Sequence, residues 1–143
     1  MKIGELASAA NCTTETIRYY EKEGLLLEAE RSASNYRSYG SAHLERLRFI
    51  RNCRALDMTH DEIRALLTLM DGPLDGCGAV NTLLDEHIGH VEARIEELQQ
   101  LKQQLRTLRQ QCQTEQGLDA CGILRGLAAM ETTPTGKRHT HLG

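Results

Sequence analysis

Residues 81–112 read NTLLDEHIGHVEARIEELQQLKQQLRTLRQQC, and this stretch decides the architecture of the chain. Apolar side chains recur in it at every seventh position, with further apolar positions between them. The seven-residue set is Leu84, Val91, Leu98, Leu105 and Cys112, and the intervening set is Ile88, Ile95, Leu101 and Leu108. Such a repeat is typical of a coiled-coil seam, because a lone helix would expose this stripe to water. The stretch therefore predicts a long helix that pairs with a second helix.

Three of the five cysteines bracket this helix: Cys77 precedes it, Cys112 ends it, and Cys121 follows. At about 1.5 Å per residue the helix measures on the order of 46 Å, whereas a thiolate sulfur lies about 2.3 Å from a bound zinc ion. Cys77 cannot share an ion with the other two cysteines of its own chain if the helix is straight. It can share one with those of an antiparallel partner. A parallel pair would instead gather four thiolates at one end and leave Cys77 dispensable.

Thiolates select soft or borderline ions such as Cd(II), Pb(II), Hg(II), Zn(II) and Cu(I). Three thiolates form an anionic pocket that suits a divalent ion, whereas two suit a linear monovalent ion. The spacing therefore predicts a metal site made of Cys112 and Cys121 from one chain and Cys77 from its partner. We expect Cys12 and Cys53, in the N-terminal segment, to be structural thiols.

Four histidines form a second candidate metal site. His87 and His90 are three residues apart and share a helix face, and His139 and His141 lie in the polar C-terminal tail. Together they could form a weaker site. The alternative is that His87 packs beside the coiled-coil seam.

The first 70 residues read as short helices separated by turns. The pattern predicts a helix over residues 3–9, a break at 11–13, and a second helix over 15–23 that Thr13 or Thr14 caps and Gly24 ends. Residues 25–40 read as a loop or short ribbon. A third helix begins after Ser41, and a fourth begins at the capping box of Thr59 and Glu62 and ends at residues 71–73.

Two helices joined by a tight turn are a helix-turn-helix candidate, in which the second helix enters the major groove of DNA. Its N-terminal residues are then placed to contact bases: Thr14, Glu15, Thr16 and Arg18. Tyr19 or Tyr20 can reach a phosphate, and we expect one of the two to lie in the core instead. On the ribbon, Tyr36 and Arg37 suit further phosphate contacts.

The charge and hydropathy of the chain are compatible with a DNA-binding protein. The net charge is −3, but residues 31–54 carry six arginines against a single glutamate, so a local basic patch permits nucleic-acid binding. The N-terminus lacks the apolar segment of a signal peptide, and no stretch is apolar enough to span a membrane. We therefore expect a cytoplasmic protein with no membrane partner, whose cysteines are thiols rather than disulfides.

Three segments of the N-terminal half resemble the winged-helix DNA-binding signature of the MerR family of transcriptional activators. They are ETIRYYE at 15–21, GLL at 24–26 and NYRSY at 35–39, and RNCRALDMT at 51–59 continues the likeness. Further along, CGAVN at 77–81, DEHI at 85–88 and CGIL at 121–124 are most similar to the cadmium- and lead-responsive branch of that family.

The resemblance implies a mainly α fold with five segments. These are a winged helix-turn-helix domain (1–72), a linker (73–80), an antiparallel coiled-coil dimerisation helix (81–112), a metal-binding loop with a short helix (113–129) and a flexible histidine-containing tail (130–143). It also implies a homodimer on promoter DNA whose two polymerase-recognition elements are too far apart. Metal binding would twist and bend that DNA so that RNA polymerase engages both elements.

The same resemblance orders the candidate ions. Cd(II) and Pb(II) come first, because copper-sensing relatives lack a cysteine at the position of Cys77. Zn(II) is less favoured, because the zinc-sensing branch adds ligands after the long helix, where residues 113–120 offer only Glu115 and Asp119. Hg(II) stays open, because the mercury branch uses three cysteines in the same layout.

Two other functions fit parts of the sequence. A thiol metal buffer or chaperone would use the cysteines and carry the basic patch incidentally. A redox sensor would close a disulfide between Cys112 and Cys121. An enzyme is not expected, because the chain has no C-x-x-C motif, nucleophile elbow, phosphate loop or clustered carboxylate pair.

Overall fold

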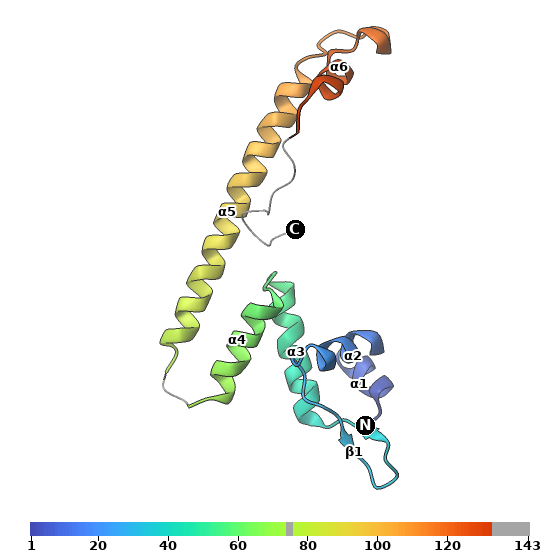
Figure 1. The fold of residues 1–143 in the computed structure, drawn as a ribbon, viewed down its shortest axis with the longest axis vertical. Helices are drawn as coiled ribbons and strands as arrows, with labels where there is room; N and C mark the ends of the chain where they lie inside the picture. Colours follow the sequence, from blue (N-terminus) through green and yellow to red (C-terminus); the bar gives the residue numbers. More distant parts are fainter. Residues whose placement is uncertain (74–75, 133–143) are drawn as a thin grey trace. The chain divides into compact units, whose positions relative to one another are not determined.

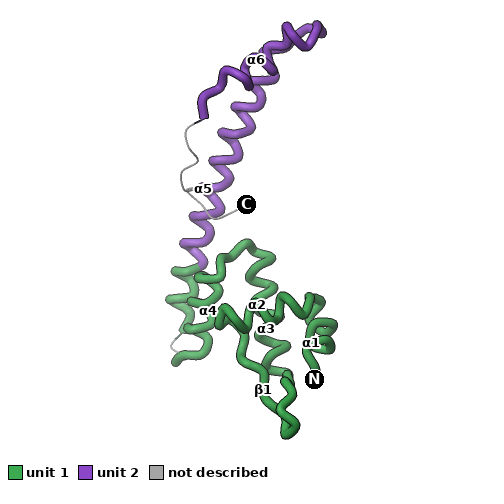
Figure 2. Tube along the Cα trace, turned by 45° about the vertical axis from the view of Figure 1, so that its right-hand side comes forward, with its two compact units in different colours: residues 1–83 green, residues 84–143 purple. Residues whose placement is uncertain are grey.

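The computed structural model describes residues 1–73 and 76–132, which form two compact units. The first unit comprises residues 1–83 and the second begins at residue 84 (Figure 2). Both are built mainly from helices, and the described strands form a single two-stranded ribbon. The prediction of a mainly α fold is confirmed.

The first unit begins with the helix-turn-helix, α1 (Ile3–Ala9) and α2 (Thr14–Lys22) (Figure 1). Asn11, between them, takes the left-handed conformation with φ 54°, which an asparagine tolerates in a tight turn. Thr13 caps α2, since its Oγ1 accepts a hydrogen bond from the Thr16 N–H at 3.1 Å. Gly24, with φ 73°, follows the end of α2 where only a glycine adopts the backbone without strain.

The ribbon that sequence left as loop or strand consists of β1 (Glu30–Arg31) and β2 (Arg37–Ser38). The strands are antiparallel and pair Glu30 with Ser38 and Arg31 with Arg37. Asn35, in the loop joining them, has φ 64° and supplies the left-handed residue of the turn. The ribbon is the wing of the helix-turn-helix domain.

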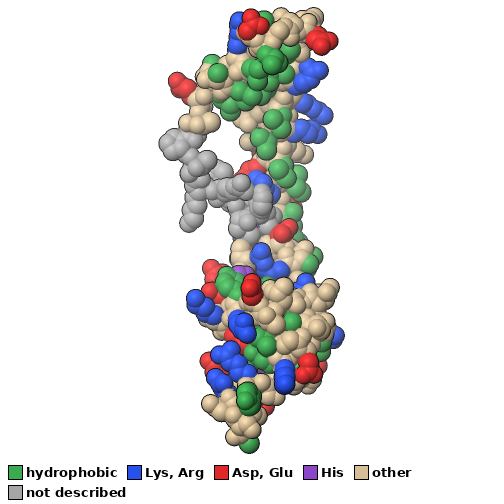
Figure 3. Space-filling model, turned by 90° about the vertical axis from the view of Figure 1, so that its right-hand side faces the viewer, with side chains coloured by type: hydrophobic (Ala, Val, Ile, Leu, Met, Phe, Trp, Pro, Cys, Tyr) green, Lys and Arg blue, Asp and Glu red, His purple; other side chains and the backbone are tan. Residues whose placement is uncertain are grey.

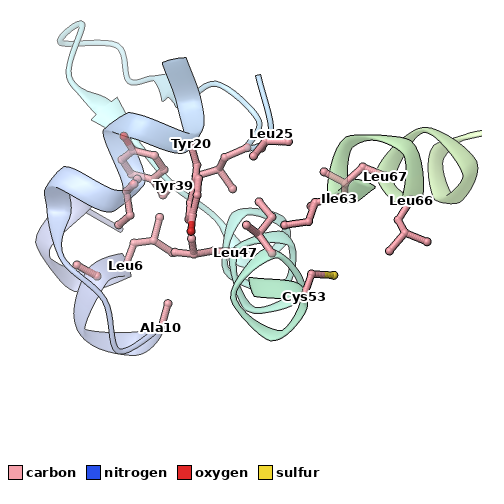
Figure 4. Close-up of a cluster of buried hydrophobic side chains, with 14 of the residues drawn as sticks. Leu6, Ala10, Tyr20, Leu25, Tyr39, Leu47, Cys53, Ile63, Leu66 and Leu67 are labelled. Carbon is pink, nitrogen blue, oxygen red and sulfur yellow. The ribbon is translucent and has the colours of Figure 1, made fainter. Parts of the chain in front are cut away.

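Behind these elements lie α3 (Ser41–Ala55) and α4 (His60–Asp71). Leu47 and Ile50 of α3 and Ile63 of α4 are completely buried, and Figure 4 shows α1, α2, α3 and α4 meeting at this core. The predicted capping box opens α4: Thr59 Oγ1 accepts from the Glu62 N–H at 3.1 Å, and the Thr59 N–H donates to Glu62 Oε1 at 2.9 Å.

The long helix α5 spans Gly78–Arg109, which differs at both ends from the predicted 81–112. It begins earlier because Val80 and Leu83 pack against the core of the first unit, and burial extends a helix beyond its sequence signal. It ends earlier because the Cys112 N–H bonds to the Arg109 carbonyl, three residues back, which tightens the last turn.

In the second unit the predicted seam lies on the surface of α5. Its members stay half exposed: Leu84, Ile88, Ile95, Leu98, Leu101 and Leu105. Figure 3 shows hydrophobic side chains along this helix, with Lys and Arg beside them. After α5 the chain makes a short 3-10 turn, η1 (Leu118–Ala120), and then the two-turn helix α6 (Gly122–Ala129).

Among the described residues, no helix is long and apolar enough to cross a membrane.

The capping box of α4 gives a direct test of local stability. Thr59→Ala removes the acceptor of the Glu62 N–H, so the free energy of unfolding should fall by about 1 kcal/mol. Thr68→Ala is the matched control, because Thr68 lies in the interior of the same helix and bonds to the Arg64 carbonyl behind it. Urea denaturation followed by circular dichroism measures both, and equal losses would contradict the capping role.

Candidate metal centre and DNA interface

Cys112 and Cys121 lie together in the second unit. Cys112 follows the end of α5, and Cys121 is the N-cap residue that immediately precedes α6. The neighbouring Cys121 thiol raises the pKa of Cys112, whose own thiol donates to the Thr114 carbonyl at 3.6 Å. The pKa of Cys121 is lowered, chiefly by the backbone N–H of Leu124 and then by that of Ile123. The pair therefore favours a thiolate at Cys121, the form that binds a soft metal.

Two glycines bring α6 this close to the end of α5. A Cβ at Gly122 would lie 2.1 Å from the carbonyl oxygen of Gln111, and a Cβ at Gly126 would lie 3.0 Å from Leu108 Cδ1. Gly122 and Gly126 are four residues apart, so both fall on one face of α6. Since Cys121 immediately precedes Gly122, this close packing sets its position beside Cys112.

Arginines hold the loop between the two cysteines. Arg109 donates from Nη1 to the Cys112 carbonyl at 2.8 Å and lines, with Cys112, Glu115 and Ile123, a hollow of about 250 Å³. Arg125 donates from Nη2 to the Asp119 carbonyl at 3.1 Å. The Arg109 cation beside Cys112 offsets part of the negative charge of clustered thiolates.

Cys77 belongs to the first unit, just before α5. It is exposed, and Asn81 Nδ2 donates to its sulfur at 3.9 Å. It opens onto an apolar groove of the same unit that is lined by Phe49, Leu66 and Met70, among others. Of the three predicted thiol ligands, the structure thus brings together two, Cys112 and Cys121.

The remaining candidates are the four histidines of the predicted second site and the two cysteines of the N-terminal segment. The His87 and His90 rings lie edge to face with centroids 6.3 Å apart, whereas His139 and His141 fall outside the described residues. The histidine site therefore stays a prediction. Cys53 is buried in the core and Cys12 packs against it, and burial raises the pKa of both thiols. Both positions agree with the expected structural role.

The candidate DNA interface is a groove between α2 and the wing. Arg18 and Lys22 line it from α2, and Arg31 and Arg37 line it from β1 and β2. Tyr36 at the wing is 75% exposed. Thr14 and Thr16 are half buried in the first turn of α2. The groove measures about 440 Å³, and its four basic side chains outnumber two acidic ones, Glu21 and Glu28, so we call it the cationic groove. Of the predicted DNA contacts, Arg18 and Arg37 line it.

The two neighbouring tyrosines of α2 separate, as expected. Tyr19 is exposed, and its hydroxyl lies 3.4 Å from His60 Nδ1. Tyr20 is the core member, with 8% of its surface exposed, and Figure 4 shows its ring between Leu6 and Leu47. The helical turn that exposes Arg18 and Tyr19 directs residue 20 inward, and a DNA contact by Tyr20 stays a prediction.

Three of the six arginines in residues 31–54, all on α3, bond to other groups of the first unit. Arg46 pairs with Asp71 at 2.7 Å, Arg51 donates to the carbonyls of Ala10 and Asn11, and Arg54 donates to the Met58 carbonyl at 2.5 Å. The number of arginines in residues 31–54 therefore overestimates how many of them are available to contact DNA. Sequence reasoning also missed Lys22, although it lies one helical turn after Arg18 on the same face.

Two family descriptions match the chain: "MerR HTH family regulatory protein" over residues 1–69 and "MerR, DNA binding" over residues 44–108. A Haemophilus influenzae protein described as "HTH-type transcriptional regulator ZntR homolog" is 47% identical over 110 residues, covering 77% of this chain and 82% of the relative. The chain belongs to the MerR family. Regulators of this family bind promoter DNA as dimers, and the matched relatives are transcriptional regulators rather than enzymes.

The further relatives place this MerR-family chain among metal-responsive regulators. A "probable heavy metal-dependent transcriptional regulator" of Haemophilus influenzae is 41% identical, covering 89% of this chain and 98% of the relative. The solved structure of the regulator PbrR691 from Ralstonia metallidurans CH34 in complex with lead(II) is 51% identical, with a TM-score of 0.81. It aligns with 89% of this chain, over 98% of its own length.

The close packing at Gly122 predicts a loss of metal affinity on substitution. Gly122→Ala places a Cβ against the Gln111 carbonyl, so α6 must move and separate Cys121 from Cys112. Gly89→Ala is the control, because a Cβ there meets nothing within 4 Å and alanine favours a helix interior. Thiolate-to-metal absorbance during Cd(II) titration should show weaker binding for Gly122→Ala alone, and equal affinities would contradict the role of Gly122.

Proposed function

We propose that this MerR-family regulator is a homodimer that activates transcription of a metal-resistance operon when a soft divalent ion binds. Cd(II) and Pb(II) are the ions that we favour. The observation that carries the proposal is the close packing of Gly122 against Gln111, which brings Cys121 beside Cys112; each thiol affects the pKa of the other, and the pKa of Cys121 is lowered. Two adjacent thiols on a loop braced by arginines supply two of the three ligands that such an ion needs.

The third ligand in this proposal is Cys77 of the partner chain. Within one chain α5 lies between Cys77 and Cys112, and its 32 residues correspond to about 48 Å of straight helix. The exposed apolar seam of α5 supplies the surface for pairing with a second copy. In an antiparallel pair each end gathers Cys77 from one chain and the other two cysteines from its partner.

The choice of ion rests on donor chemistry and on similarity. Three thiolates favour soft divalent ions over Mg(II) or Ca(II). The relative PbrR691 was solved with lead(II) and shares 51% identity with this chain, which supports Pb(II) and its soft neighbour Cd(II). Hg(II) is the second candidate, because a Bacillus megaterium MerR solved with mercury(II) is 29% identical. Zn(II) ranks last, because the described loop offers few additional ligands.

On the DNA side, the cationic groove between α2 and the wing would hold the promoter, with Arg18 reading bases and Arg37 and Tyr36 on phosphates. Metal binding at a site shared by two chains would change the geometry of the dimer and so distort the DNA until RNA polymerase engages it. A regulator of this kind acts where bacterial chromosomal DNA is found, in the cytoplasm.

The DNA-binding part of the proposal predicts a charge-dependent loss. Arg37→Met should weaken promoter binding and reduce the slope of log affinity against log salt by about 1, because one phosphate contact is lost. Arg106→Met removes the same charge from α5, which contributes no residue to the lining of the groove, and should leave the slope unchanged. Fluorescence anisotropy of a labelled promoter duplex measures both, and unchanged binding by Arg37→Met would contradict the assigned interface.

The shared metal site predicts complementation between inactive subunits. Cys77→Ser homodimers and Cys112→Ser/Cys121→Ser homodimers should each bind Cd(II) or Pb(II) weakly. Heterodimers carrying one subunit of each kind should regain one complete site. Differently tagged subunits allow the heterodimer to be purified, and metal stoichiometry and in vitro transcription provide the readouts.

A Cys12→Ser homodimer is the control for cysteine loss outside the centre and should keep both sites. A heterodimer that binds no more metal than the mutant homodimers would refute the antiparallel sharing. Competitive titration of the wild-type protein with Cd(II), Pb(II), Hg(II) and Zn(II), together with a transcription assay for each ion, ranks the candidates. A thiol buffer would bind the ions without shifting the promoter duplex.

A further inference from the structure

The wing is too small to fix its own direction. Its strands β1 and β2 contain two residues each, and every one of these side chains except that of Ser38 is exposed. A two-stranded ribbon without a hydrophobic face is marginally stable by itself. Figure 2 shows the ribbon projecting from the helices of the first unit. Its direction must therefore be set at its base, where it joins the rest of that unit.

Tyr39, the residue after β2, links the base of the wing to α2. It is 2% exposed, and its hydroxyl donates to Glu21 Oε1 at 2.5 Å. Its backbone N–H donates to the Met1 carbonyl at 2.8 Å, which adds the segment before α1. Burial, and then the Glu21 carboxylate, raise the pKa of the Tyr39 hydroxyl to about 12, so the hydroxyl keeps its proton and remains a donor. One buried side chain thus joins the wing to the helix expected in the major groove.

His43, in the first turn of α3, holds the other side of the wing base. The Gly40 N–H donates to His43 Nδ1 at 2.9 Å, and His43 Nε2 lies 2.9 Å from the Glu28 carbonyl oxygen. A neutral imidazole has one donor and one acceptor nitrogen, so Nδ1 accepts, and Nε2 carries the hydrogen and donates it. The side chain is 5% exposed. It thus ties the residue that follows the wing to the segment that leads into β1.

The two anchors act on opposite walls of the cationic groove. The rings of Tyr39 and His43 meet edge to face, with 5.2 Å between their centroids. Glu21 and Glu28, which they hold, both line the groove. Arg37, on the wing, counteracts part of the rise in the pKa of Tyr39, so its charge lies near the Tyr39 hydroxyl. Because one anchor bonds α2 and the other bonds the segment before β1, together they set the distance between the two walls.

We propose that Tyr39 and His43 are positioning residues, which hold the wing at the spacing from α2 that lets both walls of the groove contact DNA. This inference rests on the proposed DNA-binding function. Both side chains are too deeply buried to contact DNA themselves, so they act through the arginines of the groove. A loose wing has to be ordered when DNA binds, and the entropy lost in this step lowers affinity. A wing anchored at its base is ordered beforehand.

Tyr39→Phe tests the link to α2 without changing any charge. Promoter affinity should fall about tenfold, the loss expected for one hydrogen bond to a charged group. The slope of log affinity against log salt should decrease by about 1, because the wing no longer makes its phosphate contact. Ile50→Val is the control for stability, since Ile50 is completely buried in α3. It should lower the melting temperature by a few degrees and leave affinity and slope unchanged. Anisotropy and thermal denaturation of the full chain give these values.

Double substitutions show through which wall the anchor acts. Arg37→Met should cost little further affinity in the Tyr39→Phe protein, because the wing contact is already lost. Arg18→Met, on α2, should cost the same in Tyr39→Phe as in the wild type. For the second anchor, His43→Gln should retain more promoter affinity than His43→Leu, because glutamine offers both an acceptor and donors and leucine offers neither.

The inference is overturned if Tyr39→Phe, folded at the assay temperature, keeps the wild-type affinity and salt slope. Full additivity of Tyr39→Phe with Arg37→Met would also overturn it. If Tyr39→Phe does not fold, the comparison of His43→Gln with His43→Leu decides, and equal affinities of these two variants would contradict the positioning role. Failure of the wild type to bind the duplex would instead refute the proposed function.

Discussion

The apolar seam of α5 is the constraint on which the rest of this regulator depends. A helix of this length with exposed leucine and isoleucine along one stripe needs a second helix to cover it, because each half-exposed side chain leaves apolar surface in water. Its length also separates Cys77 from Cys112. Dimerisation and the proposed division of the metal ligands between two chains thus have the same physical origin, the unbroken helix between the two cysteines.

The proposed metal centre depends on close packing as much as on thiol chemistry. Gly122 and Gly126 allow α6 to approach Gln111 and Leu108 more closely than any residue with a Cβ could. This approach places Cys121 at the start of α6, where backbone N–H groups lower its pKa, and beside Cys112. A loop of eight residues between the cysteines would otherwise sample many arrangements, so the glycine contact is what brings the two thiols together as a pair of candidate ligands.

Arginines in the first unit perform two different tasks. Those on α2 and the wing, such as Arg18 and Arg37, line an open groove with their charges available to DNA. Three of those on α3, namely Arg46, Arg51 and Arg54, are anchored to carbonyls or to Asp71 and hold the turn and the helix ends together.

The sequence by itself determined the helices, the capping residues and the seam. Those features follow from local periodicity and from side chains that bond to their own backbone, as at Thr13 and Thr59. It also determined which cysteines flank α5, since chain spacing fixes how far apart a straight helix holds them. Only the tertiary structure decided which tyrosine of α2 enters the core, which arginines bind carbonyls, and how closely α6 approaches α5. Those outcomes depend on contacts between residues far apart in the chain or on the space left by a missing Cβ, and neither is encoded in any local pattern.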